Sequence, residues 1–335
     1  MNSNESGRKP QYAVSGRAAR MRRRKRKRIA LFASFALIIL LLTISAVLLA
    51  LELADVVAKN KTPDESSDNP SVTTPPPAGE EKLNYIISQS TYHTTEGALI
   101  LVNNDHEYTF PSSTSRLMNI YDTRPKDSTG KSIYSCKDST LLMDKTALAA
   151  FNKFMTDFVA ATGNQYLTVS DAYRTLADQE GKSIAPGRSD HHTGYLVAVK
   201  FVEEHTYTSD NSTKYSTEYS WLNDNAAKYG FVLRYPSSKV AYTGVSGYTY
   251  AYRYVGMAHA AYMSANNLCL EEYVELLKSS YKYSGEHLKI TDSNGVKYEV
   301  YYIAEGEPVY VPASSTAFEV SGDNTGGFIV TVTLG

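Results

Sequence analysis

Cysteine is scarce in this chain of 335 residues, which contains only Cys136 and Cys269. No CxxC pair and no cluster of cysteine and histidine occurs, so the sequence offers no structural zinc site built on thiolates. One disulfide is possible in an exported protein, but the spacing of two cysteines cannot show it. Buried free thiols are the simpler interpretation, and we expect them here.

Acidic residues are almost absent from the first 28 positions, which hold 11 of the 34 Lys and Arg residues but only one of the 35 Asp and Glu residues. The net charge of −1 is therefore an average over two unlike parts, and the chain after residue 28 is acidic. An acidic body argues against nucleic acid as a partner.

Charge is entirely absent from residues 29–51. As a helix this segment would be about 34 Å long, which is enough to cross a bilayer. The basic run at 22–28 could instead bind nucleic acid or begin a signal peptide. The hydrophobic segment is long for a signal peptide, however, and no clear small-residue cleavage site ends it. We predict a cytoplasmic basic tail over 1–28, one transmembrane helix over 29–53 and the rest of the chain outside the cell.

A polar segment rich in proline, serine and threonine follows the apolar run. Such a composition cannot bury enough apolar surface to fold, and its prolines keep it extended. We therefore predict a disordered extracellular linker over 54–82, with the globular part beginning at Leu83.

Hydrophobic periodicity predicts the main elements of the globular part. We expect strands at 98–102 and 167–170, helices at 141–161 and 270–277, and a helix, a Gly cap and a strand over 221–236. Ser293-Asn294-Gly295 lies between two alternating runs and is a strong hairpin signal. Further alternating runs follow it, so we predict a small β appendage over 281–335.

One loop carries most of the chemistry, the segment from Ser189 through His191 to Gly194, which leads into a strand. It resembles the signature of the VanY-type D-alanyl-D-alanine carboxypeptidases, zinc peptidases of the bacterial cell wall. In that family the segment reads Ser-x-His-x-x-Gly, with an Asp seven residues after the His, and the His and the Asp both hold zinc. Here His191 matches the first ligand, but Ala198 stands at the Asp position.

Two further segments resemble the same family. Tyr173-Arg174, with Gln179 downstream, matches a Tyr-Arg-Ser and Gln pattern whose Arg binds the substrate's carboxylate or the developing oxyanion. Residues 243–256 match, without a gap, a segment that carries the catalytic Glu and the last zinc His. That match puts Tyr248 at the Glu position and Ala251 at the His position.

The resemblance implies a fold and a depleted site. The fold is an α+β, zinc DD-peptidase/hedgehog-like domain over 83–280, with an antiparallel sheet flanked by helices. A catalytic zinc needs about three protein ligands and a nearby base, and of these only His191 remains. Zinc held by Asp190, His191 and His192 together is an alternative. His259 also has a family counterpart, and we expect it to be a core or helix-start histidine.

The sequence therefore favours a catalytically inactive, membrane-anchored homologue in the plasma membrane of a bacterium. Its partners would be the peptidoglycan stem peptide or a cell-wall enzyme, with no cofactor. Arg174, Gln179, Ser189 and Tyr248 would bind the peptide. Two alternatives stay open. One is an active carboxypeptidase with a rearranged zinc site, which cleaves the terminal D-Ala of stem peptides. The other is a purely structural or interaction protein that uses the β appendage.

Overall fold

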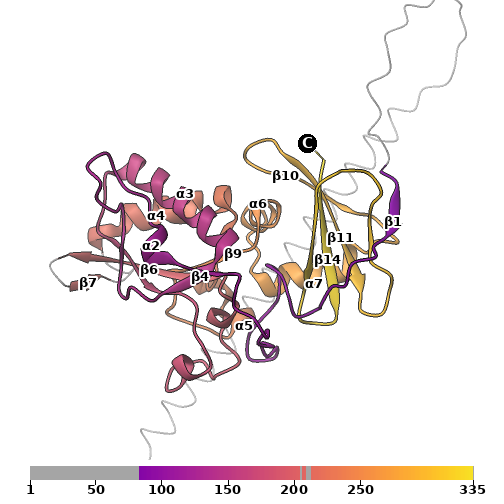
Figure 1. Cartoon of the computed structure of the whole chain (residues 1–335), viewed down its shortest axis with the longest axis horizontal. Coiled ribbons are helices and arrows are strands. Elements are labelled where there is room, and N and C mark those ends of the chain that lie inside the picture. The colour runs from indigo at the N-terminus through magenta and orange to yellow at the C-terminus, as the bar shows by residue number, and fades with distance from the viewer. Residues whose placement is uncertain (1–82, 204–205, 209–212, 335) are drawn as a thin grey trace, which may run out of the picture. The chain divides into compact units, whose positions relative to one another are not determined.

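The computed structural model describes residues 83–203, 206–208 and 213–334, which belong to one compact unit built around two main sheets (Figure 1). In these residues no helix is long and apolar enough to cross a membrane. The predicted basic tail, transmembrane helix and linker over 1–82 lie outside the described residues.

The larger sheet carries the candidate site. Its strands run in the order β3-β5-β6-β9-β8, with β7 paired to β6, and all pairs are antiparallel except β3 with β5. A separate short pair joins β2 and β4. The bounds are β2 Leu117–Asn119, β3 Ser135–Cys136, β4 Leu142–Asp144, β5 Leu167–Asp171, β6 Leu196–Glu203, β7 Thr206–Thr208, β8 Phe231–Leu233 and β9 Ala251–Tyr254.

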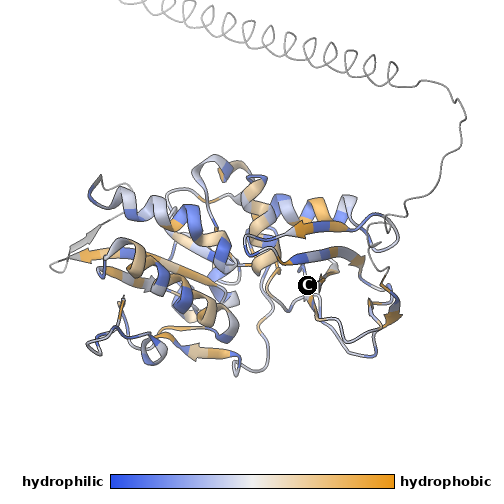
Figure 2. Cartoon of the chain, turned by 90° about the horizontal axis from the view of Figure 1, so that it is seen from above, coloured by the Kyte–Doolittle hydropathy of each residue, from blue (hydrophilic) through white to orange (hydrophobic). Residues whose placement is uncertain are grey.

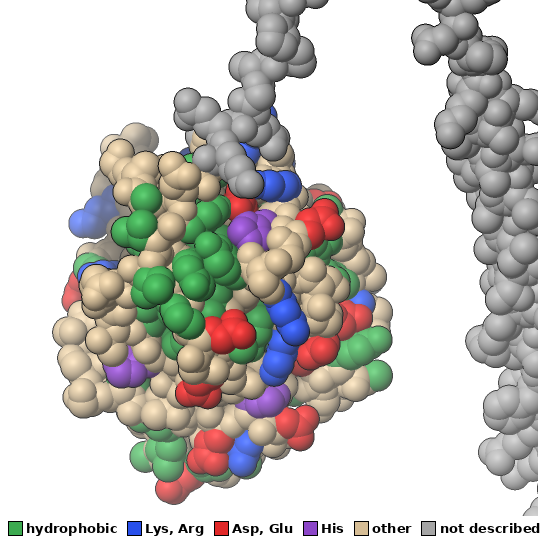
Figure 3. All heavy atoms as spheres, turned by 90° about the vertical axis from the view of Figure 1, so that its right-hand side faces the viewer, with side chains coloured by type: hydrophobic (Ala, Val, Ile, Leu, Met, Phe, Trp, Pro, Cys, Tyr) green, Lys and Arg blue, Asp and Glu red, His purple; other side chains and the backbone are tan. Residues whose placement is uncertain are grey.

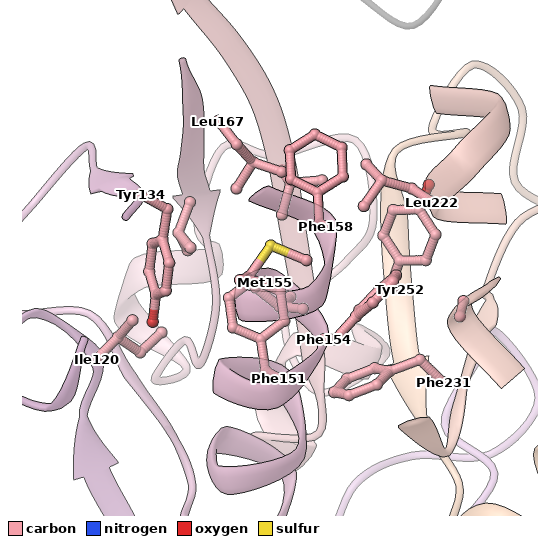
Figure 4. Packing of buried hydrophobic residues seen from close by; sticks show 14 of the residues in the cluster. Ile120, Tyr134, Phe151, Phe154, Met155, Phe158, Leu167, Leu222, Phe231 and Tyr252 are labelled. Carbon is pink, nitrogen blue, oxygen red and sulfur yellow. The ribbon is translucent and has the colours of Figure 1, made fainter. Parts of the chain in front are cut away.

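Helices cover this sheet, and the longest is α3 (Lys145–Thr162). Its Phe151, Phe154 and Phe158 are fully buried, and Figure 4 shows them among side chains of the sheet and of α4 (Ser216–Asn225). The predicted helix began at residue 141, which was too early. Asp144 caps α3 by accepting from the N–H groups of the two residues at its second and third positions, so the preceding residues form β4 instead.

The second sheet lies in the C-terminal part, in the order β10-β11-β14-β13. Its hairpin between β10 and β11 is the one expected at Asn294-Gly295. The first described strand, β1, pairs with β12 in this same region, so the chain enters the unit beside its C-terminal strands. The bounds are β1 Tyr85–Ile87, β10 Leu288–Thr291, β11 Lys297–Ala304, β12 Tyr310–Pro312, β13 Phe318–Gly322 and β14 Gly327–Thr333.

Two helices, α6 (Met257–Ala265) and α7 (Leu270–Ser280), share a hydrophobic core with β10, β11 and β14 and lie between the two sheets (Figure 1). The short helices α2 (Ile120–Thr123) and α5 (Val240–Thr243) complete the set in the described part. The residues predicted as an appendage are thus continuous with the helices before them. His259 on α6 bonds Tyr273 and Thr331 inside this core, as expected.

The predicted strand over 98–102 is wrong. Leu99, Leu101 and their neighbours are buried, but the segment forms no ladder. It is wedged between hydrophobic clusters, and its N–H groups bond single atoms of the C-terminal part, namely Ser321 Oγ and Asp323 O. A short apolar run indicates burial but cannot identify its hydrogen-bond partners.

Hydropathy follows this architecture. In Figure 2 the strands are coloured largely as hydrophobic, whereas the covering helices alternate between the two colours, as amphipathic helices do. Figure 3 shows that hydrophobic side chains also gather on one outer face, on the side of the molecule that carries β1. Cys136 and Cys269 are both free thiols, as expected, but only Cys269 is fully buried.

Candidate functional site

Three neighbouring strands bring the positions of interest into one row. Ala198 on β6 pairs with Ala251 on β9 and, on its other side, with Asp171 on β5. Residues that are directly opposite in a strand pair project to the same face of the sheet. A β-bulge just before Asp171 brings its carboxylate into this row. Both alanines are fully buried, so the two positions that match zinc-ligand positions in the resembling family lie together inside the sheet.

His191 lies next to this row in a short turn, η2 (Asp190–Thr193), which ends at Gly194 with a φ of 73°. Its Nδ1 is 2.5 Å from the carbonyl oxygen of Ala172, so Nδ1 carries the proton and Nε2 is an acceptor. The hydroxyl of Tyr248 lies 2.5 Å from Nε2 and donates to it. Burial lowers the pKa of His191 to about 4, so the ring is neutral at pH 7.

Tyr248 fills the space beside Ala251. It packs against Leu196, Tyr235 and Ala251, and its ring stacks on Tyr235 with centroids 5.6 Å apart and planes 13° apart. Burial, reinforced by the charge of Asp171, raises the pKa of the Tyr248 hydroxyl above its ordinary value. Tyr248 is therefore a hydrogen-bond donor to His191, and it cannot act as a base at neutral pH.

Asp171 and Gln179 hold the Arg174 side chain in place. Its Nε is 3.1 Å from both carboxylate oxygens of Asp171, and its Nη2 also contacts that carboxylate. Its Nη1 donates to Gln179 Oε1 at 2.7 Å, and Gln179 in turn donates to the carbonyl of Ile184. Burial alone would raise the pKa of Asp171, but the hydrogen bond from Arg174 and the neighbouring charges outweigh it and lower the pKa. The guanidinium is thus oriented before any ligand arrives.

Sequence reasoning missed Asp171. An acidic residue three positions before Arg174, at the end of a predicted strand, was a usable signal. The β-bulge that places this carboxylate opposite Ala198 could not be predicted from the local sequence, because the bulge arises from the pairing of β5 with β6.

Asp190 belongs to a buried ionic network behind the site. Its carboxylate accepts from Arg234 Nε at 2.5 Å and from Arg253 Nε at 3.0 Å, and all three side chains are fully buried. Arg234 also binds Glu271 with both terminal nitrogens. Burial opposes ionisation, but the two arginines outweigh it and lower the pKa of Asp190. This network joins η2 to β9, to α7 and to the residue that follows β8, so it fixes the turn that carries His191.

The two residues that flank His191, Asp190 and His192, already have hydrogen-bond partners. His192 uses Nδ1 to contact the carbonyl of Arg174 and accepts at Nε2 from the N–H of Gly187. Asp190 is committed to its two arginines. Zinc held jointly by Asp190, His191 and His192 would need all three to exchange these partners, and the arrangement does not support it.

A cavity of about 390 Å³ opens beside Tyr248. Arg174, Gln179 and Tyr248 line it, so three of the four residues predicted to bind substrate come together. Ser189 does not line it; its Oγ is buried and has no hydrogen-bond partner in the described part. The full lining is Lys137, Ser170, Asp171, Arg174, Gln179, Lys182, Ser183, Ile184, Lys200, Val245, Ser246, Gly247, Tyr248 and Tyr250.

The donor set does not fit a catalytic zinc ion. Alanine offers no ligand atom at 198 or 251, and the ligand nitrogen of His191 already accepts a hydrogen bond from Tyr248. No group of three His, Cys, Asp or Glu side chains within the described ranges could hold a metal ion. His191 keeps the tautomer in which Nε2 could bind a metal, but positions 198 and 251 supply no further ligand atoms.

Comparisons with known proteins agree with this scaffold. The VanY family model, described as D-alanyl-D-alanine carboxypeptidase, matches residues 180–257. A D-alanyl-D-alanine carboxypeptidase of Enterococcus faecium is 28% identical over 254 residues, which cover 71% of this chain and 75% of that protein. Another D-alanyl-D-alanine carboxypeptidase, from Enterococcus faecalis, is 31% identical over 109 residues, which cover 30% of this chain and 35% of that protein.

One solved structure shows the likeness of fold. The vancomycin resistance D,D-dipeptidase VanXYg, in complex with a D-Ala-D-Ala phosphinate analogue, superposes with a TM-score of 0.58 and 21% identity. The match covers 75% of this chain and 98% of that one. The mixed arrangement of sheets and helices is therefore shared with a D,D-peptidase.

Proposed function

Because the chain belongs to the VanY-type D-alanyl-D-alanine carboxypeptidase family, we propose that it binds the D-alanyl-D-alanine end of peptidoglycan stem peptides without cleaving it. Its relatives are carboxypeptidases of the cell wall, and the cleft keeps the oriented Arg174 with Gln179 and Tyr248. A cell-wall enzyme bound at the same cleft is the other partner we consider. We also propose that residues 29–53 anchor the protein in the plasma membrane, with the described part outside.

The hydrogen bond between Tyr248 and His191 carries this proposal. In a zinc peptidase the free nitrogen of this histidine would bind the metal. The metal would activate a water molecule, and a nearby carboxylate would accept the proton of that water. Here a protonated phenol contacts that nitrogen at 2.5 Å, and the same residue stands where the family has its base. Tyr248 thus donates a hydrogen bond to the nitrogen that would bind zinc, and it also stands in place of the carboxylate that would act as the base.

Zinc content tests the absence of catalysis. The full chain, purified and dialysed against trace zinc, should hold well under one tightly bound zinc per chain and should release no D-alanine from a stem-peptide analogue. About one tight zinc per chain, or D-alanine release that a chelator abolishes, would contradict it.

Peptide binding tests the role of the cleft. Arg174→Ala removes charge-assisted hydrogen bonds worth about 1.5–3 kcal/mol, so affinity for a D-alanyl-D-alanine peptide should fall about 10–100-fold. Arg188→Ala is the matched control, because Arg188 is a half-buried arginine paired with Glu107 away from the cavity. Equal affinity of wild type and Arg174→Ala would favour the purely structural alternative.

A specific observation keeps the active alternative in view. The Asp171 carboxylate lies directly across the strands from Ala198, where the family places a ligand. If it moved from Arg174 to a metal held by His191, a rearranged two-residue site would form. The zinc measurement on Asp171→Asn decides this, because only the alternative predicts zinc in the wild type and its loss in the variant.

A further inference from the structure

The cavity carries more positive charge than a peptide carboxylate requires. Four of its lining residues are cationic, namely Lys137, Lys182, Lys200 and Arg174, against the single carboxylate of Asp171. Arg174 is already paired with that carboxylate. Three lysines therefore remain, and we call Lys137, Lys182 and Lys200 the lysine cluster.

The lysine cluster is assembled from three separate parts of the chain. Lys137 follows β3 and its N–H bonds Val169 on β5. Lys200 lies on β6, with its ammonium 4.5 Å from the centroid of the Tyr250 ring, which holds it at the cavity wall. Lys182 lies in the loop after Gln179, to which its N–H is bonded. Local spacing in the sequence could not reveal such a set.

No member of the cluster has an ion pair in the described part of the chain. Asp138 follows Lys137 in the sequence, and Asp178 and Glu180 precede Lys182, but none of these three carboxylates lines the cavity. The charges of Lys137 and Lys182 contribute to the lowered pKa values of Asp138 and Asp178, whose carboxylates also accept hydrogen bonds from Thr140 and Thr175. Three like charges around one concave wall repel one another, and a bound anion would relieve that repulsion.

The chemistry of the donors indicates which anion. A planar carboxylate suits the fork of an arginine, and Arg174 keeps one N–H on each terminal nitrogen beyond its bonds to Asp171 and Gln179, so the peptide carboxylate is assigned to Arg174. Lysine ammonium groups act as point charges and bind phosphate well. The hydroxyls of Ser183 and Ser246 line the same cavity and supply further donors.

We propose that the lysine cluster binds a phosphate group, either as free phosphate or as a phosphodiester of a larger molecule. The proposal rests on the proposed function only in treating this cleft as a binding site that does not hydrolyse its ligand. Peptide carboxylate and phosphate would occupy different donors in one cavity, the first at Arg174 and the second at the lysine cluster.

Calorimetric titration of the full chain in detergent at low salt tests this, with inorganic phosphate and oligo(glycerol phosphate) as separate probes. Lys200→Gln should weaken phosphate binding about tenfold, and replacement of all three lysines by Gln about a hundredfold or more. Lys153→Gln, an exposed lysine on α3 outside the cavity, should leave the affinity unchanged. Binding should also weaken as salt rises. Tighter binding of the oligomer would identify an esterified source, and equal binding a free one.

The result that overturns the proposal is the absence of phosphate binding to the wild type, or binding that the triple variant retains. A D-alanyl-D-alanine peptide titrated in parallel separates the two ideas. Peptide binding without phosphate binding would refute the phosphate site at the lysine cluster and support the proposed function. Phosphate binding without peptide binding would support the phosphate site and refute the proposed function. Wild-type salt dependence needs no variant, so the test holds even if the triple variant unfolds.

Discussion

Building a zinc site at positions 198, 248 and 251 should require coupled changes, because Tyr248 and Ala251 share one space. Ala251 is fully buried against Tyr248, Leu196 and Tyr235. Ala251→His alone forces a ring into this packed cluster, and overpacking of this kind costs about 1–3 kcal/mol or more. Tyr248→Glu alone empties the space and removes the donor to His191, so it also destabilises the fold.

In the double variant the new imidazole can occupy the space that Tyr248 vacates. We expect its destabilisation to be smaller than the sum of the two single effects by about 1–3 kcal/mol, which is the range of coupling between residues in contact. Addition of Ala198→Asp then gives His191 two further ligand side chains, at positions 198 and 251, which are partners across β6 and β9. Zinc at about a thousandfold its dissociation constant should stabilise this triple variant by about 4 kcal/mol.

Denaturant unfolding of the full chain, with and without zinc, measures both quantities, and metal analysis gives the stoichiometry. Ala198→Asp alone is the control: it adds a carboxylate opposite Asp171 and should bind no tight zinc. If that single change produced zinc binding and activity, or if the Tyr248 and Ala251 effects were simply additive, our placement of these residues would be refuted.

Three further outcomes follow from buried polar groups. Tyr248→Phe leaves His191 Nε2 without its donor and should cost about 1–3 kcal/mol in urea unfolding; an unchanged midpoint would contradict the hydrogen bond. Asp190→Asn removes a charge paired with two buried arginines and should cost about 3–5 kcal/mol, against almost nothing for exposed Asp105→Asn. Burial lowers the pKa of His259 to about 3 from an unfolded value of 6.5, so its stabilising contribution is complete above pH 6.5 and is lost as pH falls toward 3. The free energy of unfolding of His259→Gln should therefore fall less steeply with acid, by about 1.4 kcal/mol per pH unit, and equal slopes would show that this histidine does not titrate on unfolding.

The sequence predicted the scaffold better than the contacts at the site. Strong patterns located β5, the core face of α3 and the β10–β11 hairpin, because each depends on local spacing. The motif matches also placed Ala198 and Ala251, which the structure pairs as cross-strand neighbours.

The rest depends on tertiary geometry that spacing does not encode. Tyr248 was singled out as the replacement for a base, but its hydrogen bond to His191 joins residues 57 positions apart. Asp190 was considered as a metal ligand, whereas Arg253 on β9 and Arg234, which follows β8, both bind it. Ser189 matches the motif, yet it is buried away from the cavity lining.

The pairing of β1 with β12 has a mechanical consequence. If residues 29–53 hold the chain in a membrane, as proposed, any pull on that anchor enters the described unit at Tyr85. There it meets a three-residue ladder and the hydrogen bond from Tyr85 Oη to Glu299, at 2.5 Å, both in the C-terminal part. Tension would peel β1 away before it reached β5, β6 or β9. The pairing of β1 with β12 would thus yield first, and the cleft would keep its shape under tension.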